Sequence, residues 1–357
     1  LEMKAVILKG RRNYLCNTRL DWMIRSSKKI LNKSDCENIL PIIVWSEITL
    51  TGDIDECSSF RPSFSSRLWK LICSEPGYCT TQRCDHHNGC FLRKNRNATS
   101  KADILVVNHA LLINELMREN PSLPEKYCYV IDEGHNLEQA AKDQLICQIS
   151  ERSFEEIFEY FSIDNLIYQK FRTKIKVTET VLDDALMEIN TRCSSIQNKL
   201  KKFFKHYKRV KSTQFDKRNQ KYEQKFIYND AKEEYFGVDI SPFQIYSKLN
   251  KLLNELEIFS QNVRDVSTDK NTTYRRELEI RLLSLQSAII IFDRILKVDR
   301  EDIVWSSFYR YNNKIYTSLN CAPRDVSTFI ANGILSKRVG GVVCSATLTV
   351  ESSFRYL

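Results

Sequence analysis

The sequence predicts an α/β protein whose parallel sheet is interrupted by a cysteine-rich segment and by a long helical segment. Three observations lead to this fold class. Cysteines crowd residues 73–90, and glycine becomes rare beyond about residue 149, where apolar residues recur at helical spacing. Short apolar, β-branched runs are typical of buried parallel strands, namely residues 4–9, 102–107, 127–131 and 341–345.

Composition limits the class of protein. At 357 residues the chain is long enough for two or three domains. Lysine and arginine exceed aspartate and glutamate by 54 − 45 = 9, which suits a polyanionic partner, although solvated surface lysines explain the excess equally well. There is no membrane-length apolar run and no secretory leader pattern, so no membrane partner is expected. The 12 cysteines are unevenly placed, which favours a metal site over disulfides in a reducing compartment.

The first strand leads into a turn at residues 10–12, and a helix is predicted over residues 13–32. Residues 58–78 are polar with scattered aromatics and are expected to be irregular and partly helical. No Gly-x4-Gly-Lys-Ser/Thr phosphate loop occurs anywhere in the sequence.

The central strand ends in Asp132-Glu133-Gly134-His135. Open α/β sheets bind their ligands at the carboxyl ends of strands. In a nucleoside triphosphatase the first carboxylate of such a pair holds Mg²⁺, and the second orients or deprotonates the attacking water. A polar helix cap explains the same residues, because Asp-Glu commonly starts a helix. The segments on either side of these four residues favour a hydrolysis site over a helix cap.

Beyond residue 149 the apolar spacing predicts long helices at residues 153–161, 178–210, 242–263 and 274–297. The charged, aromatic segment 211–234 predicts a loop or a hairpin. After residue 300 the sequence predicts a strand pair, a helix and a last core strand, at residues 303–305 with 314–319, 326–335 and 340–344.

The Asp-Glu-Gly-His segment resembles the Asp-Glu-Ala-His box of superfamily 2 helicases. It is most similar to the DinG-like branch of the DinG/XPD iron–sulfur helicases, where this form is usual. The likeness is specific over residues 4–140 and 300–350 and only architectural between them. Further segments agree in order, namely residues 8–16, Thr51-Gly52-Asp53, Cys79/Cys84/Cys90, residues 107–112 and Cys344-Ser345-Ala346-Thr347-Leu348.

The resemblance implies a RecA-like motor domain 1 with an iron–sulfur insertion and an all-helical arch insertion. It implies ATP and Mg²⁺ as cofactors, with Asp132 holding Mg²⁺ and Glu133 activating water. It also implies that His135, Ser345 and Thr347 couple hydrolysis to domain movement. In the family a phosphate loop precedes the first segment and a second motor domain follows the last. We therefore expect an internal fragment that is inactive in ATP hydrolysis by itself.

The cysteine spacing Cys79-x4-Cys84-x5-Cys90 offers three thiolates, and a four-iron four-sulfur cluster needs one thiolate for each iron. The resemblance gives Cys16 as the fourth ligand. Cys73 is a rival for that place, and Cys57 is a weaker one. Zinc is the alternative metal, with help from the adjacent residues His86 and His87.

Basic residues flank the predicted ligands. A metal cluster would hold them in place for phosphate contacts, and the aromatic residues Tyr14, Tyr78 and Phe91 lie among them for base stacking. A solvated loop remains the alternative for each residue taken alone. With two residues of the 107–112 segment, the expected DNA-binding set is Arg11, Arg12, Tyr14, Asn108, His109, Arg93, Lys94 and Arg96.

The expected domain boundaries are motor domain 1 at residues 1–35, 101–148 and 301–357, the iron–sulfur domain at 36–100 and the arch at 149–300. The resemblance implies an ATP-dependent helicase that moves 5′ to 3′ on single-stranded DNA. It would unwind forked or displaced duplexes in repair or replication, as a monomer in the bacterial cytoplasm near the nucleoid. Two alternatives stay open: an XPD-branch repair or transcription helicase, and a non-motor iron–sulfur module for DNA binding or redox sensing.

Overall fold

The computed structural model divides the chain into two compact units, which we describe separately. Unit 1 comprises Leu1–Gln144 and Ser327–Leu357, and unit 2 comprises Leu145–Val326. The residues that the structure describes are 3–25, 27, 31–60, 66–75, 89–118, 123–124, 128–162, 165, 168–169, 172–173, 180–212, 214, 223–235, 237–266, 272–311, 314–335 and 340–346.

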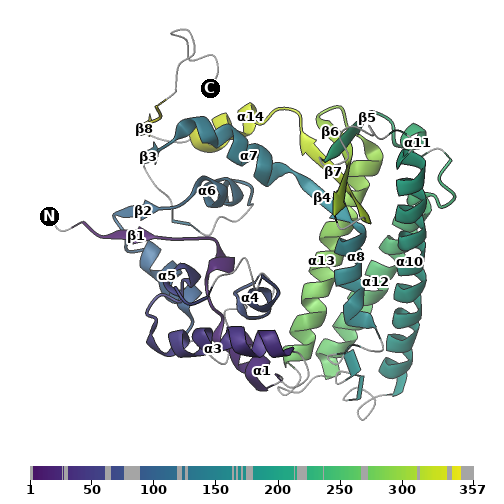
Figure 1. The fold of residues 1–357 in the computed structure, drawn as a ribbon, viewed down its shortest axis with the longest axis horizontal. Coiled ribbons are helices and arrows are strands. Elements are labelled where there is room, and N and C mark those ends of the chain that lie inside the picture. Colours follow the sequence, from purple (N-terminus) through teal and green to yellow (C-terminus); the bar gives the residue numbers. More distant parts are fainter. Residues whose placement is uncertain are drawn as a thin grey trace, which may run out of the picture. The chain divides into compact units, whose positions relative to one another are not determined.

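Unit 1 contains the parallel strands that the sequence predicts. Strand β1 (Ala5–Ile7) pairs in parallel with β2 (Ile104–Val106), and β3 (Cys128–Ile131) pairs in parallel with β8 (Gly340–Val343) (Figure 1). The described parts of these strands form two separate two-stranded sheets. The α/β class with parallel pairing is therefore confirmed, although the strands are shorter than predicted.

Helices surround these strands in unit 1. Asn32 caps α3 through a capping box with Asp35, which fixes where that helix begins. The predicted first helix is shorter than expected and starts at Asn17, after a single turn η1. The helical elements are η1 (Arg11–Asn13), α1 (Asn17–Arg25), α3 (Lys33–Ile48), η2 (Ile54–Glu56), α4 (Ser66–Ile72), α5 (Phe91–Thr99), α6 (His109–Leu116), η3 (Gly134–Asn136), α7 (Leu137–Leu145), α14 (Ser327–Ile330) and the π-helical turn η6 (Ala331–Leu335).

Unit 2 combines long helices with an antiparallel sheet. The long helices follow the predicted segments closely and run side by side in Figure 1, namely α8 (Glu151–Phe158), α10 (Thr180–Ser212), α12 (Pro242–Val266) and α13 (Thr272–Lys297). Two short helical elements accompany them, η4 (Glu159–Phe161) and α11 (Ala231–Glu234), and α11 lies in the segment that was predicted to be a loop or a hairpin. The sheet has the order β4-β7-β6-β5, with β4 (Cys147–Ser150), β5 (Gln224–Tyr228), β6 (Asp302–Tyr311) and β7 (Lys314–Pro323).

The expectation of an all-helical insertion at residues 149–300 is wrong, because β5 and the end of β4 lie within it and pair with β6 and β7. Each of these strands is too short for its alternation to stand out in sequence. They are stabilised by long-range pairing with the ten-residue strands β6 and β7. From the sequence we expected residues 301–357 to belong to the motor domain, whereas the structure groups residues up to Val326 with the long helices of unit 2.

The core of unit 2 lies between the helices and one face of the sheet. Ile149, Val304 and Leu319 of the strands are buried in the same cluster as Phe203 and Phe292 of the helices. In the described part of the chain, no helix is both long enough and apolar enough to cross a membrane.

Candidate functional site

The Asp-Glu-Gly-His turn follows the buried residue Ile131 at the end of β3. Glu133 adopts a left-handed backbone conformation with φ 49° and ψ 48°, which is costly for a residue with a Cβ. The Asp132 carboxylate stabilises this conformation, because its Oδ1 accepts a hydrogen bond from the Glu133 amide at 3.0 Å. Asp132 and Glu133 are both exposed residues.

The Ser-Ala-Thr segment lies beside this turn, because β8 is the parallel partner of β3. The Cys344 amide donates to the Ile131 carbonyl, and the Gly134 amide donates to the Cys344 carbonyl, both at 2.8 Å. The next residue, Ser345, places its Oγ 2.6 Å from His135 Nδ1. Two segments more than 200 residues apart in sequence therefore meet through their side chains.

His135 also contacts a carboxylate. Its Nδ1 lies 3.3 Å from Glu133 Oε2, with the His135 side chain 35% exposed and the Glu133 side chain 57% exposed. The structure thus brings together three of the predicted catalytic residues, Glu133, His135 and Ser345. Thr347 lies outside the described residues.

The 107–112 segment reaches the same turn. Asn108 caps α6, and its Oδ1 accepts a hydrogen bond from the Leu111 amide at 2.8 Å. His109 Nε2 lies 2.9 Å from the backbone oxygen of Asp132. Because a carbonyl oxygen only accepts, Nε2 carries the proton in this contact. Both residues belong to the predicted DNA-binding set. In the structure Asn108 caps α6, and His109 contacts the backbone of Asp132.

Two of the four predicted cluster ligands lie in the described part of the chain. Cys16 follows Leu15, and its amide donates to the Ile72 carbonyl at 2.9 Å. Cys90 is the residue before α5. Asn17 Nδ2 donates to the Gly89 carbonyl at 3.3 Å, so the neighbours of the two cysteines are in contact.

Both thiols are partly exposed, as ligands of a metal cluster need to be before it binds. Cys79 and Cys84 lie outside the described residues. Within the described ranges, no group of three histidine, cysteine or acidic side chains is close enough to hold a metal.

The rival ligands are buried. Cys73 is 1% exposed and belongs to the cluster around Leu15 and Trp69, and Cys57 is buried in the same cluster. Burial raises the pKa of both thiols. Metal ligation requires the thiolate, which such an apolar environment disfavours. The donor chemistry therefore fits Cys16 better than Cys73.

Helix α5 carries the predicted basic residues and is fastened to the Thr-Gly-Asp turn. Asn95 Nδ2 donates to the Thr51 carbonyl at 3.0 Å, and Lys94 Nζ donates to the Leu50 carbonyl at 3.3 Å. Phe91 lies directly over Gly52, where an added Cβ would meet the ring at 2.3 Å. Gly52 also has φ +68°, so this close approach requires glycine.

Arg93 and Lys94 are exposed on α5, and Arg96 is partly exposed. In η1, Arg11 is partly exposed and Arg12 is exposed, with its Nε 3.9 Å from Glu75 Oε1. Helix α5 and the turn η1 therefore both carry basic side chains at the surface.

Tyr14 differs from the expectation of base stacking. Its ring is 2% exposed, packs with Leu8 and Leu92, and its hydroxyl accepts a hydrogen bond from the Lys9 amide at 3.0 Å. Burial raises the pKa of the hydroxyl. In this conformation the ring is not available to a base, so we leave Tyr14 out of the proposed DNA surface.

Sequence reasoning missed two cations that support this region. Arg19 donates to the carbonyls of Cys73 and Lys70 at 2.6 and 2.8 Å, at the C-terminal end of α4. Lys9 lies 2.6 and 2.7 Å from carboxylate oxygens of Asp53 and Asp55. No local pattern reveals such pairs, because their partners are about 50 residues away.

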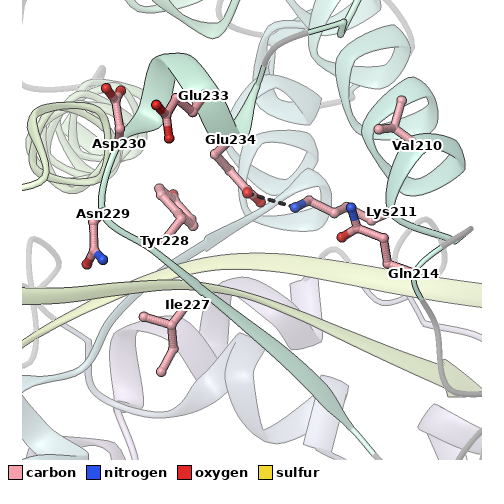
Figure 2. A pocket seen from close by; sticks show the side chains of 9 residues that line it. All are labelled: Val210, Lys211, Gln214, Ile227, Tyr228, Asn229, Asp230, Glu233 and Glu234. Carbon is pink, nitrogen blue, oxygen red and sulfur yellow. Dashed lines mark hydrogen bonds and ion pairs between the residues drawn. The ribbon is translucent and has the colours of Figure 1, made fainter.

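A pocket of about 540 Å³ lies in unit 2. Figure 2 shows Lys211 extended toward Glu234, and their charged groups are 2.7 Å apart in a buried ion pair. None of the residues predicted to be functional contributes to the pocket. Its lining residues are Val210, Lys211, Gln214, Ile227, Tyr228, Asn229, Asp230, Glu233 and Glu234.

Comparisons with known proteins agree with the motif order. A family model described as DEAD_2 matches residues 1–154. The "ATP-dependent helicase DinG" of Mycobacterium tuberculosis (strain ATCC 25177 / H37Ra) is 31% identical over 147 residues, which cover 38% of this chain and 22% of that protein. The "ATP-dependent DNA helicase YoaA" of Escherichia coli (strain K12) is 28% identical over 179 residues, or 49% of this chain and 27% of that protein.

One relative aligns along the whole chain, including unit 2. The "3'-5' exonuclease DinG" of Bacillus subtilis (strain 168) is 23% identical over 372 residues, which cover 99% of this chain and 38% of that protein. The chain thus spans between about a fifth and two fifths of the length of these relatives. Over residues 1–154 the chain is thus similar to the DEAD_2 family and to the DinG and YoaA helicases, in agreement with the resemblance that its motifs indicate.

Proposed function

We propose that this chain forms part of an ATP-dependent DNA helicase in which unit 1 contributes to the hydrolysis site. The observation that carries the proposal is the contact of His135 with both Ser345 and Glu133. A helix cap alone gives no reason for a histidine to join the carboxylate turn to a second motif. The printed names of the M. tuberculosis and E. coli relatives support the same activity.

In the proposed reaction a water molecule attacks the terminal phosphate of ATP. Asp132 would hold Mg²⁺, which neutralises phosphate charge when bound, and its exposed carboxylate is a suitable hard ligand. Glu133 would orient the attacking water and accept its proton on Oε1 or Oε2. When Glu133 accepts this proton, its contact with His135 would change. His135 would transmit that change to Ser345 and the neighbouring Thr347, because its Nδ1 contacts both Glu133 and Ser345.

We further propose a four-iron four-sulfur cluster held by Cys16, Cys79, Cys84 and Cys90. The partly exposed thiols of Cys16 and Cys90 support this ligand set, as does the hydrogen bond between their neighbouring residues. The cluster would fix the segment between α4 and α5, which has few aliphatic residues to bury.

The DNA partner in this proposal is a single strand, reached from forked or displaced duplexes and followed 5′ to 3′ by a monomer. Arg11, Arg12, Arg93, Lys94 and Arg96 would contact phosphates. Their exposure and the fastening of α5 to the Thr-Gly-Asp turn support this surface. Asn108 and His109 would link that surface to the hydrolysis site, since His109 contacts the Asp132 backbone and Asn108 caps the helix that carries His109.

The test is Glu133→Gln in the full-length protein, with Glu138→Gln as the matched control. Glu138 is a neighbouring carboxylate on α7 that pairs with Lys142. Glu133→Gln should reduce DNA-stimulated ATP hydrolysis by about two to four powers of ten while ATP still binds. Glu138→Gln should hydrolyse ATP normally.

Normal turnover by Glu133→Gln would overturn the motor assignment and leave Asp132 and Glu133 as structural residues. The non-motor iron–sulfur module would then be the better description. Measuring iron content and DNA binding on the same samples would separate that module from a protein without a cluster.

A further inference from the structure

Cys147 and Cys321 form a cross-strand pair where the chain enters and leaves unit 2. The unit runs from Leu145 to Val326, so one cysteine lies near each end. In the antiparallel pairing of β4 with β7 the two cysteines are directly opposite each other. Ile149 and Leu319, two residues further along, are also opposite and buried in the core, so both thiols point to the same face of the sheet.

An arginine lies against this pair. Arg294 of α13 donates from Nη1 to Cys147 Sγ at 3.8 Å. Its Nε and Nη2 are held by the two carboxylate oxygens of Asp302 on β6. This bidentate pair fixes the guanidinium, so the positive charge beside the sulfur is part of the folded structure.

The two thiols have different chemistry. A hydrogen bond from Cys321, together with Arg294, outweighs burial and the charge of Asp302 and lowers the pKa of Cys147 to about 6. The same hydrogen bond and burial raise the pKa of Cys321. Because Arg294 contacts Cys147 and Cys321 is buried, Cys147 is the more nucleophilic of the two thiols.

We propose that Cys147 and Cys321 form a reversible disulfide when the protein meets a hydroperoxide, and that this bond ties the first strand of unit 2 to its last. The Cys147 thiolate attacks a peroxide oxygen, so an S–O bond forms, the O–O bond breaks and hydroxide or alkoxide leaves with the electron pair. Cys321 sulfur then displaces hydroxide from the sulfenic acid to form the S–S bond, and the Cys321 proton converts that hydroxide to water. A dithiol reductant restores both thiols by exchange.

The strand geometry allows this bond with a small movement. Directly opposed Cβ atoms in antiparallel strands are about 4.5–5.5 Å apart, and a disulfide needs about 3.5–4.5 Å. Cys147 is the first residue of β4, so the strand end can approach without disturbing the pairs further along. This inference does not depend on the proposed helicase activity.

The test treats the full-length protein with one equivalent of hydrogen peroxide at pH 7, followed by digestion and non-reducing mass spectrometry. We expect a linked peptide that joins Cys147 to Cys321 and disappears on addition of dithiothreitol. The link should be absent from Cys147→Ser and Cys321→Ala. It should persist in Cys193→Ser, the matched control, whose thiol is buried in the same core with its pKa raised to about 12.

Arg294→Gln should slow formation of the linked peptide several-fold by removing the charge that favours the thiolate, and Arg294→Lys should recover part of the rate. Circular dichroism of each variant checks that unit 2 is folded. Oxidation of Cys147 to a sulfinic acid while Cys321 still reacts with an alkylating reagent would overturn the proposal. So would two fully alkylated thiols after peroxide treatment of the folded protein.

Discussion

Units 1 and 2 bury their apolar residues to different degrees. In unit 2 the helices and the sheet share one continuous core. In the described part of unit 1 the buried residues form separate, smaller clusters. Its parallel strands also leave apolar residues exposed, with Ile7 66%, Val130 72% and Val342 51% accessible. Parallel strands are usually covered on both faces, so this exposure is unusual.

The contrast shows that two sources of stability operate in one chain. Burial explains the fold of unit 2. Unit 1 depends more on individual polar contacts, such as those of Arg19 with the end of α4 and of Asn95 with the Thr-Gly-Asp turn. The proposed metal cluster would add a further source there. Changes in the polar and metal contacts should therefore affect unit 1 and leave unit 2 intact.

Loss of the cluster should have the broadest effect, because it changes the iron content, the DNA affinity and the resistance to proteolysis together. In Cys84→Ser we expect loss of iron and of brown colour, and an affinity for single-stranded DNA lower by about tenfold, or about 1.4 kcal/mol. The reason is that the metal would hold the basic residues in place without itself touching phosphate. Fluorescence anisotropy across a salt series measures the affinity, and the parent protein should bind less tightly as salt increases.

Cys36→Ser is the control for that change, because Cys36 is exposed on α3 and outside the ligand set. Limited proteolysis should show new cleavage in residues 36–100 of Cys84→Ser and the usual pattern in unit 2. Unchanged DNA affinity in a folded protein without iron would separate the cluster from DNA binding.

Gly52→Ala should have the largest effect on the free energy of unfolding. The new Cβ would meet the Phe91 ring at 2.3 Å at a residue with φ +68°. We expect a loss of about 2–4 kcal/mol in the free energy of unfolding, from overpacking and backbone strain together. Urea unfolding followed by circular dichroism measures this loss.

Gly237→Ala in unit 2 is the matched substitution. Gly237 has φ +78°, but an added Cβ would meet nothing within 4 Å, so only backbone strain of about 1–2 kcal/mol is expected. Equal losses in the two variants would mean that the contact between Gly52 and Phe91 does not fasten α5.

Removal of the Lys9 charge should have the smallest effect on the free energy of unfolding. Burial disfavours its ammonium group, but hydrogen bonds and charge from Asp53 and Asp55 outweigh this and raise the pKa of Lys9 to about 12 from 10.5. Because the folded-state pKa is the higher one, the stabilisation is complete below pH 10.5 and is lost as the pH rises through about 12.

Lys9→Met should therefore lower the free energy of unfolding by at most about 1 kcal/mol at pH 8, and the difference from the parent should shrink between pH 10.5 and 12. Urea unfolding at several pH values tests this. Lys33→Met, at an exposed lysine that begins α3, should show no such trend. A pH-independent difference would assign the effect to the lost packing of the side-chain stem.

The sequence predicts the elements that depend on local pattern. The helices α10, α12 and α13 and the strand β3 lie close to their predicted ranges, because their apolar spacing is sufficient to specify them. The order of motifs also indicates the same helicases that the comparisons find over residues 1–154, and the structure brings Glu133, His135 and Ser345 together.

The sequence does not predict features set by distant partners. Strands β4 and β5 exist because β7 and β6 pair with them. Tyr14 is an aromatic residue of the kind that stacks on bases, yet its packing against Leu8 and Leu92 buries the ring. The left-handed conformation of Glu133 has no local signal either, since glutamate seldom adopts it without support from its surroundings.

The main-chain bonds of residue 344 have a consequence for labelling the protein. Its amide and carbonyl connect to both sides of the Asp-Glu-Gly-His turn, while the Cys344 side chain is exposed. The position of Ser345 beside His135 therefore rests on backbone atoms that every amino acid except proline possesses. Residue 344 is thus suited to carry a fluorophore or spin label without loss of these main-chain bonds.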